Sequence, residues 1–232
     1  MDGVFHILNR GVDKRKIFLD NQDRLRFVHD LFEFNDQEPV NTTFHIFQKV
    51  KNSKNNVIGT RNIGTDERKP RSLLVNIHAF CIMSNHYHLL LSPQIENGAP
   101  RFMQKLNIGY VRYFNERYKR NGTLFEGGYK FIPVIDDSHF IHLPYYIHLN
   151  PLDAVFPEWR DRKLRSYNKA IKFLNSYRWS SHLDYIGHKN FPSVTQRDFL
   201  IRFFGDANEY KDGVKQWLRD LDLDDIRDVS LE

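Results

Sequence analysis

Residues 83–91 read MSNHYHLLL, and this stretch decides how the rest of the chain is interpreted. Side chains two positions apart on a strand point to the same face, so His86 and His88 project together while Tyr87 faces the other way. Two such imidazoles, with Cα atoms about 6–7 Å apart, can share one divalent ion. A His-x-His pair alone is also common in sites with no metal. The stretch therefore predicts a strand that carries two candidate metal ligands. A second motif is needed before a metal site can be inferred.

The segments around this strand alternate between strand and helix patterns. Strand patterns occupy residues 4–9, 44–50, 73–83 and 129–135, and apolar residues at helical spacing occupy residues 21–34, 100–118 and 137–150. The order predicts an α+β fold: a ferredoxin-like split β-α-β antiparallel sheet with helices on one face, followed by a helical C-terminal extension.

Two divisions of the chain follow from these patterns. Residues 1–152 are predicted to form one domain, and residues 51–72, which are polar and rich in turn-forming residues, are predicted to be a peripheral insertion in a hairpin. Residues 153–232 are predicted to be the helical extension, with short helices at 199–204 and 214–221 and a frayed or disordered acidic tail. Residues 179–181, Trp-Ser-Ser, are expected to pack the extension onto the domain.

Size, cysteine content and charge exclude some classes of protein. A chain of 232 residues can bury a core without disulfides, and its single cysteine, Cys81, cannot form an internal bridge, which favours a reducing, cytoplasmic compartment. No signal peptide is evident, and no apolar run is long enough to span a membrane. The net charge of +5 weakly favours a polyanionic partner.

The positive charge is concentrated in residues 101–130. Seven Lys and Arg residues lie there against two Glu residues, interleaved with seven aromatic residues. Cations bind phosphates and aromatic faces stack on unpaired bases, so this mixture suits single-stranded nucleic acid. A solvated helix face above an aromatic core would have the same composition, and the sequence leaves both interpretations open.

A second motif lies at residues 145–151, YYIHLNP. Tyr146 and Asn150 are four residues apart, so a helix places them on one face. A phenol with a pKa near 10 is a weak nucleophile unless a metal or base stabilises its phenolate, and the Asn150 amide oxygen could ligate that metal. Tyr145 lacks the four-residue step to Asn150. The alternative is that both tyrosines are core residues, and Pro144 predicts a kink or a late helix start.

Together, residues 83–91 and 146–151 resemble the single-tyrosine HUH transposases, in particular the branch associated with repetitive extragenic palindromes (REP). Residues 9–11, 122–127 and 177–181 support the resemblance, which extends from residue 4 to about residue 187. It implies that residues 1–152 are the catalytic domain, that His86, His88 and Asn150 bind Mg²⁺ or Mn²⁺, and that Tyr146 is the nucleophile. It further implies single-stranded DNA with a hairpin as substrate, a 5′-phosphotyrosine intermediate and a monomer or homodimer.

Five cationic residues are candidates for DNA contact. Arg10 follows the first strand and Lys130 opens the last, so both are expected near the sheet, where DNA phosphates would lie. Arg112, Arg117 and Arg120 are expected to grip a hairpin stem. Ordinary surface charge is the alternative for all five.

The sequence leaves three functions open. The first is DNA strand cleavage and transfer by a tyrosine transposase. The second is a non-catalytic nucleic-acid-binding regulator with the same fold, although such a protein need not retain His86, His88, Tyr146 and Asn150. The third is a metal-dependent phosphodiesterase that uses water and would dispense with Tyr146.

Overall fold

The structure, a computed structural model, describes residues 3–38, 70–135, 137–161 and 163–220. The predicted strand at residues 44–50, most of the predicted insertion at 51–72 and the acidic tail lie outside these ranges. The domain comprises strands β1 (Val4–Arg10), β2 (Val75–Ile82), β3 (His86–Pro93) and β4 (Lys130–Val134) with helices α1 (Asn21–Glu33), α2 (Gly98–Arg117) and α3 (Asp137–Leu149).

The four strands form one antiparallel sheet in the order β2-β3-β1-β4. Two β-α-β units interleave in this order, as in ferredoxin-like folds, so the predicted fold class is confirmed. The register between β1 and β3 places Arg10 opposite His86 and Leu8 opposite His88. The end of the first strand therefore lies directly beside the candidate ligands.

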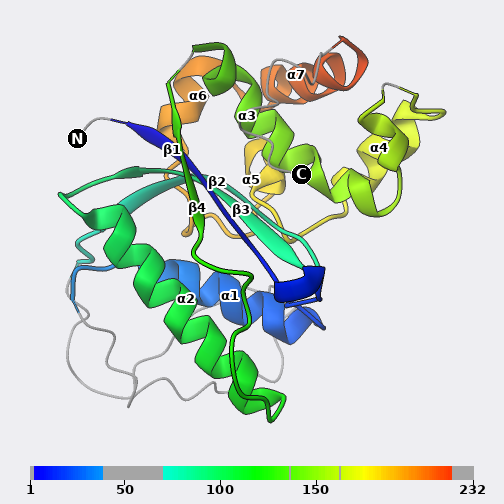
Figure 1. Cartoon of the computed structure of the whole chain (residues 1–232). Helices are drawn as coiled ribbons and strands as arrows, with labels where there is room; N and C mark the ends of the chain where they lie inside the picture. The colour runs from blue at the N-terminus through cyan, green and yellow to red at the C-terminus, as the bar shows by residue number, and fades with distance from the viewer. Residues whose placement is uncertain (1–2, 39–69, 136, 162, 221–232) are drawn as a thin grey trace, which may run out of the picture.

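Helices α1 and α2 cover one face of the sheet (Figure 1). Ile7, Tyr87 and Leu89 point into this layer and are fully buried. Phe102 and Tyr110, from the aromatic-rich stretch at 101–130, are also fully buried there. These aromatic side chains belong to the core, which favours the interpretation of a charged helix surface above an aromatic core.

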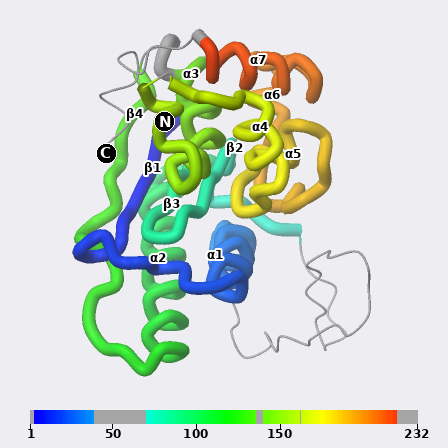
Figure 2. Tube along the Cα trace, turned by 90° about the vertical axis from the view of Figure 1, so that its right-hand side faces the viewer, coloured from blue at the N-terminus to red at the C-terminus, as the bar shows by residue number. Residues whose placement is uncertain are grey.

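Helix α3 and the C-terminal helices cover the opposite face (Figures 1 and 2). The extension contains α4 (Tyr167–Leu174), α5 (His182–Tyr185), α6 (Asp198–Phe204) and α7 (Ala207–Asp220). The last two confirm the helices predicted at 199–204 and 214–221, although α7 starts earlier than expected. In the described part of the chain, no helix has both the length and the apolar character needed to cross a bilayer.

The extension also hydrogen-bonds to β2. The backbone N–H of Ile82 donates to Trp179 O at 2.8 Å, and the N–H of Ser181 donates to Phe80 O at 3.0 Å. The hydroxyl of Ser181 in turn accepts from the N–H of Phe80 at 2.9 Å. Residues 179–181 thus follow the side of β2 that faces away from β3, which confirms that this segment packs the extension onto the domain.

Candidate metal and tyrosine site

Strand β3 presents its two histidines to the face covered by α3. Tyr87 and Leu89 point to the α1 and α2 layer, so His86 and His88 must point the other way. Their ring centres are 5.0 Å apart, the planes are nearly perpendicular at 85°, and His88 is buried. The backbone alternation thus brings both imidazoles together, as predicted.

Each imidazole is held through its Nδ1 atom. His86 Nδ1 lies 2.7 Å from Asn85 Oδ1, which can only accept, so His86 carries its proton on Nδ1 and a lone pair on Nε2. His88 Nδ1 lies 2.9 Å from Nε2 of His6 on β1. The Nε2 atom of His88 is buried and has no hydrogen-bond partner among the described residues. Both rings are oriented by neighbours on the side away from Nε2.

Asn150 brings its carboxamide to the same place. It starts the 3₁₀ helix η3 (Asn150–Ala154) that continues α3, and its Nδ2 donates to the carbonyl of Tyr146 at 2.9 Å. Its Oδ1 is buried and accepts no hydrogen bond within the described ranges. The carboxamide is close enough to His86 and His88 to favour their protonated forms. Asn150 is therefore fixed at one end and turned toward the imidazoles at the other.

Tyr146 faces the histidines, whereas Tyr145 does not. The Tyr146 ring is fully buried, and its centre lies 5.9 Å from that of His88 at an interplanar angle of 87°. Tyr145 stacks on Tyr210 of α7, with ring centres 5.1 Å apart. Helix α3 continues through Pro144, so the predicted late start does not occur. The arrangement favours Tyr146 over Tyr145 as the candidate nucleophile.

Burial keeps both imidazoles neutral. It lowers the pKa of His86 to about 4, an effect that Asp153 and Asn150 oppose and Arg160 reinforces. The pKa of His88 is well below its ordinary value, first because of burial and then because a charge on His86 would repel a second one. Neutral imidazole is the form that offers a lone pair to a metal ion.

The donor set fits one divalent cation. No group of three or more His, Cys, Asp or Glu side chains suited to a metal occurs in the ranges that the structure describes, so a site formed with His86 and His88 would need the Asn150 amide as its third ligand. Nε2 of His88 and Oδ1 of Asn150 are buried without hydrogen bonds there. Each such atom costs about 1–3 kcal/mol, and coordination of a cation would remove that cost. Two imidazoles and one amide also leave coordination positions open for substrate and water.

Sequence reasoning missed Arg160 and Asp153, which follow α3. The guanidinium of Arg160 lies above the Tyr146 ring, and it binds the Asp153 carboxylate through Nε at 2.8 Å and Nη2 at 2.6 Å. Trp159 Nε1 donates to the same carboxylate at 2.6 Å. The signal in the sequence is an acidic and a basic residue shortly after the tyrosine motif. Nothing local indicates that this turn folds back over the tyrosine.

A pocket of about 410 Å³ opens beside His86. Arg10, Lys14 and Lys130 line it together with Glu126. The side chain of Arg10 forms an ion pair with Glu126 at 2.7 Å, and Lys130 is exposed. Two of the predicted DNA-contacting residues, Arg10 and Lys130, thus lie next to the histidines in a mainly cationic pocket.

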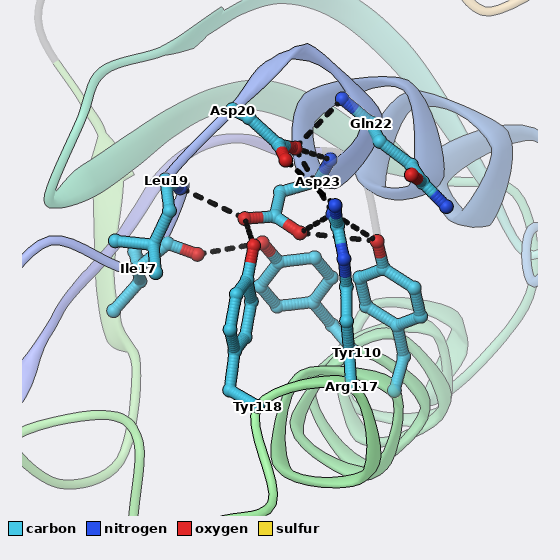
Figure 3. A network of polar contacts seen from close by, with 9 residues as sticks. Ile17, Leu19, Asp20, Gln22, Asp23, Tyr110, Arg117 and Tyr118 are labelled. Atoms are coloured by element: carbon cyan, nitrogen blue, oxygen red, sulfur yellow. Dashed lines mark hydrogen bonds and ion pairs between the residues drawn. The ribbon is translucent and has the colours of Figure 1, made fainter.

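The other three predicted DNA contacts lie on or just beyond α2, on the opposite side of the sheet. Arg112 is exposed, and Arg120 donates to Thr123 O at 3.4 Å. Arg117 forms ion pairs with Asp20 and Asp23 (Figure 3), and its hydrogen bonds hold the pKa of Asp20 below its usual value. The structure does not bring these arginines to the histidine site, and their contact with a hairpin stem stays a prediction.

The segment that carries both motifs matches a known protein family. Residues 66–150, which contain His86, His88, Tyr146 and Asn150, match the family model described as IS200-like transposase. A solved structure described as the REP associates tyrosine transposase bound to a REP hairpin aligns with a TM-score of 0.47 and 10% sequence identity, covering 84% of this chain and 86% of that one. No curated protein matches significantly. Over residues 66–150 the chain is thus similar to IS200-like transposases, in agreement with the resemblance that its two motifs carry.

Proposed function

We propose that this protein is a metal-dependent DNA transposase that cleaves and rejoins single-stranded DNA near hairpins through a 5′-phosphotyrosine intermediate. One observation carries the proposal: the ring of Tyr146, Nε2 of His88 and Oδ1 of Asn150 meet on one face of the sheet. The match of residues 66–150 to IS200-like transposases supports the same class of reaction.

His86, His88 and Asn150 would hold a Mg²⁺ or Mn²⁺ ion. When bound, such an ion offsets the charge of the phosphodiester and makes its phosphorus more electrophilic. The chain contributes the rigidity of the donor set, because Asn85 and His6 fix the imidazoles and the Tyr146 carbonyl fixes Asn150. Ligands that are already oriented need little reorganisation when the substrate arrives.

Tyr146 would perform the covalent step. Its hydroxyl oxygen attacks the phosphorus, a bond forms between Tyr146 and the 5′-phosphate, and the bond from phosphorus to the 3′-oxygen breaks. The phenol loses one proton and the departing 3′-oxygen gains one, so the step consumes no net proton and the 3′-oxygen becomes a free hydroxyl. The reverse reaction with a different 3′-hydroxyl rejoins the DNA and releases Tyr146, so no external energy source is consumed.

The hydrogen bond between Asn150 and the backbone of Tyr146 would keep the nucleophile and the metal ligand at a constant position relative to each other. The Asn150 amide donates to the Tyr146 carbonyl at 2.9 Å, so the two residues belong to one rigid helical turn. Arg10, Lys14 and Lys130 line the adjacent pocket and would bind the phosphates that flank the scissile bond. The cationic residues would therefore bind DNA next to the proposed ligand His86, which lines the same pocket.

An adduct assay tests the proposal. The full chain is incubated with Mn²⁺ and single-stranded hairpin oligonucleotides labelled at the 3′ end, because a 5′-phosphotyrosine retains the downstream fragment. We expect a labelled protein band that survives denaturation in the wild type and in Tyr145→Phe but is lost in Tyr146→Phe. The Tyr145 variant is a matched control, since its ring packs against α7.

The same assay separates the alternatives. Cleavage without an adduct, retained in Tyr146→Phe, would indicate a phosphodiesterase that uses water. Binding without cleavage across a panel of hairpins would indicate a non-catalytic regulator. Either result would overturn the proposed transposase chemistry.

A further inference from the structure

We propose that His6 is a positioning residue for His88: it accepts the Nδ1 proton of His88 and so keeps the lone pair of His88 on Nε2, where a metal ion would bind. This role rests on the proposed metal site. It assigns a function to a histidine of the first strand that belongs to neither motif.

The contact between the two histidines is close and buried. His6 Nε2 lies 2.9 Å from His88 Nδ1, and the rings are nearly parallel, with centres 5.2 Å apart and planes at 12°. Neither side chain is more than 1% exposed. The register pairs Leu8 with His88, so His6 reaches the ligand diagonally from the adjacent strand on the same face of the sheet.

The tautomer of the pair decides whether His88 can bind a cation. One proton must lie between the two nitrogens for the hydrogen bond to exist, and a neutral imidazole carries only one N–H. If His6 supplied that proton, His88 would carry its own proton on Nε2, which is buried and makes no hydrogen bond among the described residues, and an N–H cannot bind a cation. If His88 supplies it, Nε2 carries a lone pair. Only the second arrangement makes His88 a ligand.

The two ligands are thus oriented by different means. His86 is held by Asn85, its neighbour in the turn between β2 and β3, whereas His88 is held by a residue 82 positions away in sequence. His6 also lies beside Tyr146, with ring centres 6.5 Å apart and planes at 85°. The loss of His6 would therefore free the His88 ring to change its orientation, whereas the Asn85–His86 contact in the turn between β2 and β3 would remain.

Three variants test this role. His6→Phe keeps a ring but removes the acceptor, and His6→Gln restores an acceptor oxygen of similar reach. His78→Phe is the matched control, since His78 is also buried, lies on β2 and bonds to Ser92 Oγ at 2.8 Å. Mn²⁺ binding to the full chain without DNA is measured from the electron paramagnetic resonance of free Mn²⁺, and thermal unfolding without metal shows whether each variant folds.

We expect His6→Phe to weaken Mn²⁺ binding by about 10- to 100-fold, His6→Gln to recover most of the affinity and His78→Phe to bind like the wild type. Wild-type affinity in a folded His6→Phe variant, or no recovery in His6→Gln, would overturn the role of His6 alone. No Mn²⁺ binding by the wild type would overturn the metal site itself. These two failures are distinguishable.

A second measurement does not require any variant of His6 to fold. Nitrogen-15 spectra of histidine-labelled wild-type protein without metal report which ring nitrogen carries the proton, and His88→Asn assigns the His88 signals by their loss. We expect His88 to be protonated at Nδ1. Protonation at Nε2 would refute the proposal.

Discussion

The guanidinium carbon of Arg160 lies 5.5 Å from the centre of the Tyr146 ring, on the turn that follows the tyrosine-bearing helix. Asp153 fixes this guanidinium with two hydrogen bonds. A cation near an aromatic face is attracted to the ring, and it also favours phenolate over phenol. In the proposed reaction, Arg160 would therefore assist Tyr146 as the phenol loses its proton.

Removal of Arg160 should slow formation of the covalent DNA adduct. We expect Arg160→Ala to reduce the rate by about 10- to 100-fold, because loss of one well-placed charge typically raises a barrier by a few kcal/mol. Arg160→Lys should retain part of the rate. Arg165→Ala, an exposed arginine in the same extension, is the control. An equal loss in both alanine variants would mean that the effect is not specific to Arg160.

The Asp23 carboxylate should be important for stability. It is fully buried and accepts hydrogen bonds from Arg117, from the hydroxyls of Tyr113 and Tyr118 and from the N–H of Leu19. Asp23→Ala leaves these donors without their acceptor, so we expect a loss of about 3 kcal/mol or more in the free energy of unfolding, measured with urea. Arg112→Ala, on the exposed side of α2, should change it by less than about 0.5 kcal/mol.

The pocket beside His86 should contribute to DNA binding through charge. We expect the double variant Arg10→Ala/Lys130→Ala to bind single-stranded DNA more weakly. The slope of log affinity against log salt should fall by about 1.4, or about 0.7 for each phosphate that is no longer neutralised. Fluorescence anisotropy at several salt concentrations measures the slope. Lys169→Ala, which removes an exposed charge from α4, should leave it unchanged. An unchanged slope in the double variant would exclude these phosphate contacts.

The stability of the protein should fall in mild acid because of buried neutral histidines such as His78. Burial lowers the pKa of His78 from 6.5 to about 4, so the unfolded chain takes up this proton first as the pH falls. The stabilising contribution is complete above pH 6.5 and is lost progressively toward pH 4. At pH 5 the loss is about 2 kcal/mol.

Urea unfolding of His78→Gln tests this dependence. The variant should lose about 2 kcal/mol less than the wild type between pH 7 and pH 5, because glutamine does not titrate. His188→Gln, at an exposed position, is the comparison. If wild type and His78→Gln lost the same free energy, His78 would not be responsible.

The sequence predicted the parts of the site that depend on local periodicity. Alternation in residues 83–91 placed His86 and His88 on one face, because a strand permits no other arrangement once Tyr87 is buried. The four-residue step selected Tyr146, because a helix stacks it with Asn150. The ferredoxin-like order followed from the succession of strand and helix patterns. These features need no knowledge of distant contacts.

His6 and Arg160 could not be predicted, because their roles depend on contacts with residues far away in the chain. A histidine on a strand gives the same pattern whether it meets a ligand or an ordinary core residue. An arginine after a helix gives no sign of the direction in which the turn will fold. Composition alone also could not decide whether the aromatic residues of α2 stack on bases or belong to the core. The structure shows that Phe102 and Tyr110 are buried. Tertiary packing determines these outcomes.

The pairing of residues 179–181 with β2 has a consequence for shortened forms of the protein. Without this segment, the outer N–H and C=O groups of Phe80 and the N–H of Ile82 would lose their partners and could pair with a strand of another molecule. We expect a chain cut before residue 179 to aggregate into β-rich assemblies instead of forming a smaller soluble domain. The extension would then prevent self-association by covering the outer edge of β2.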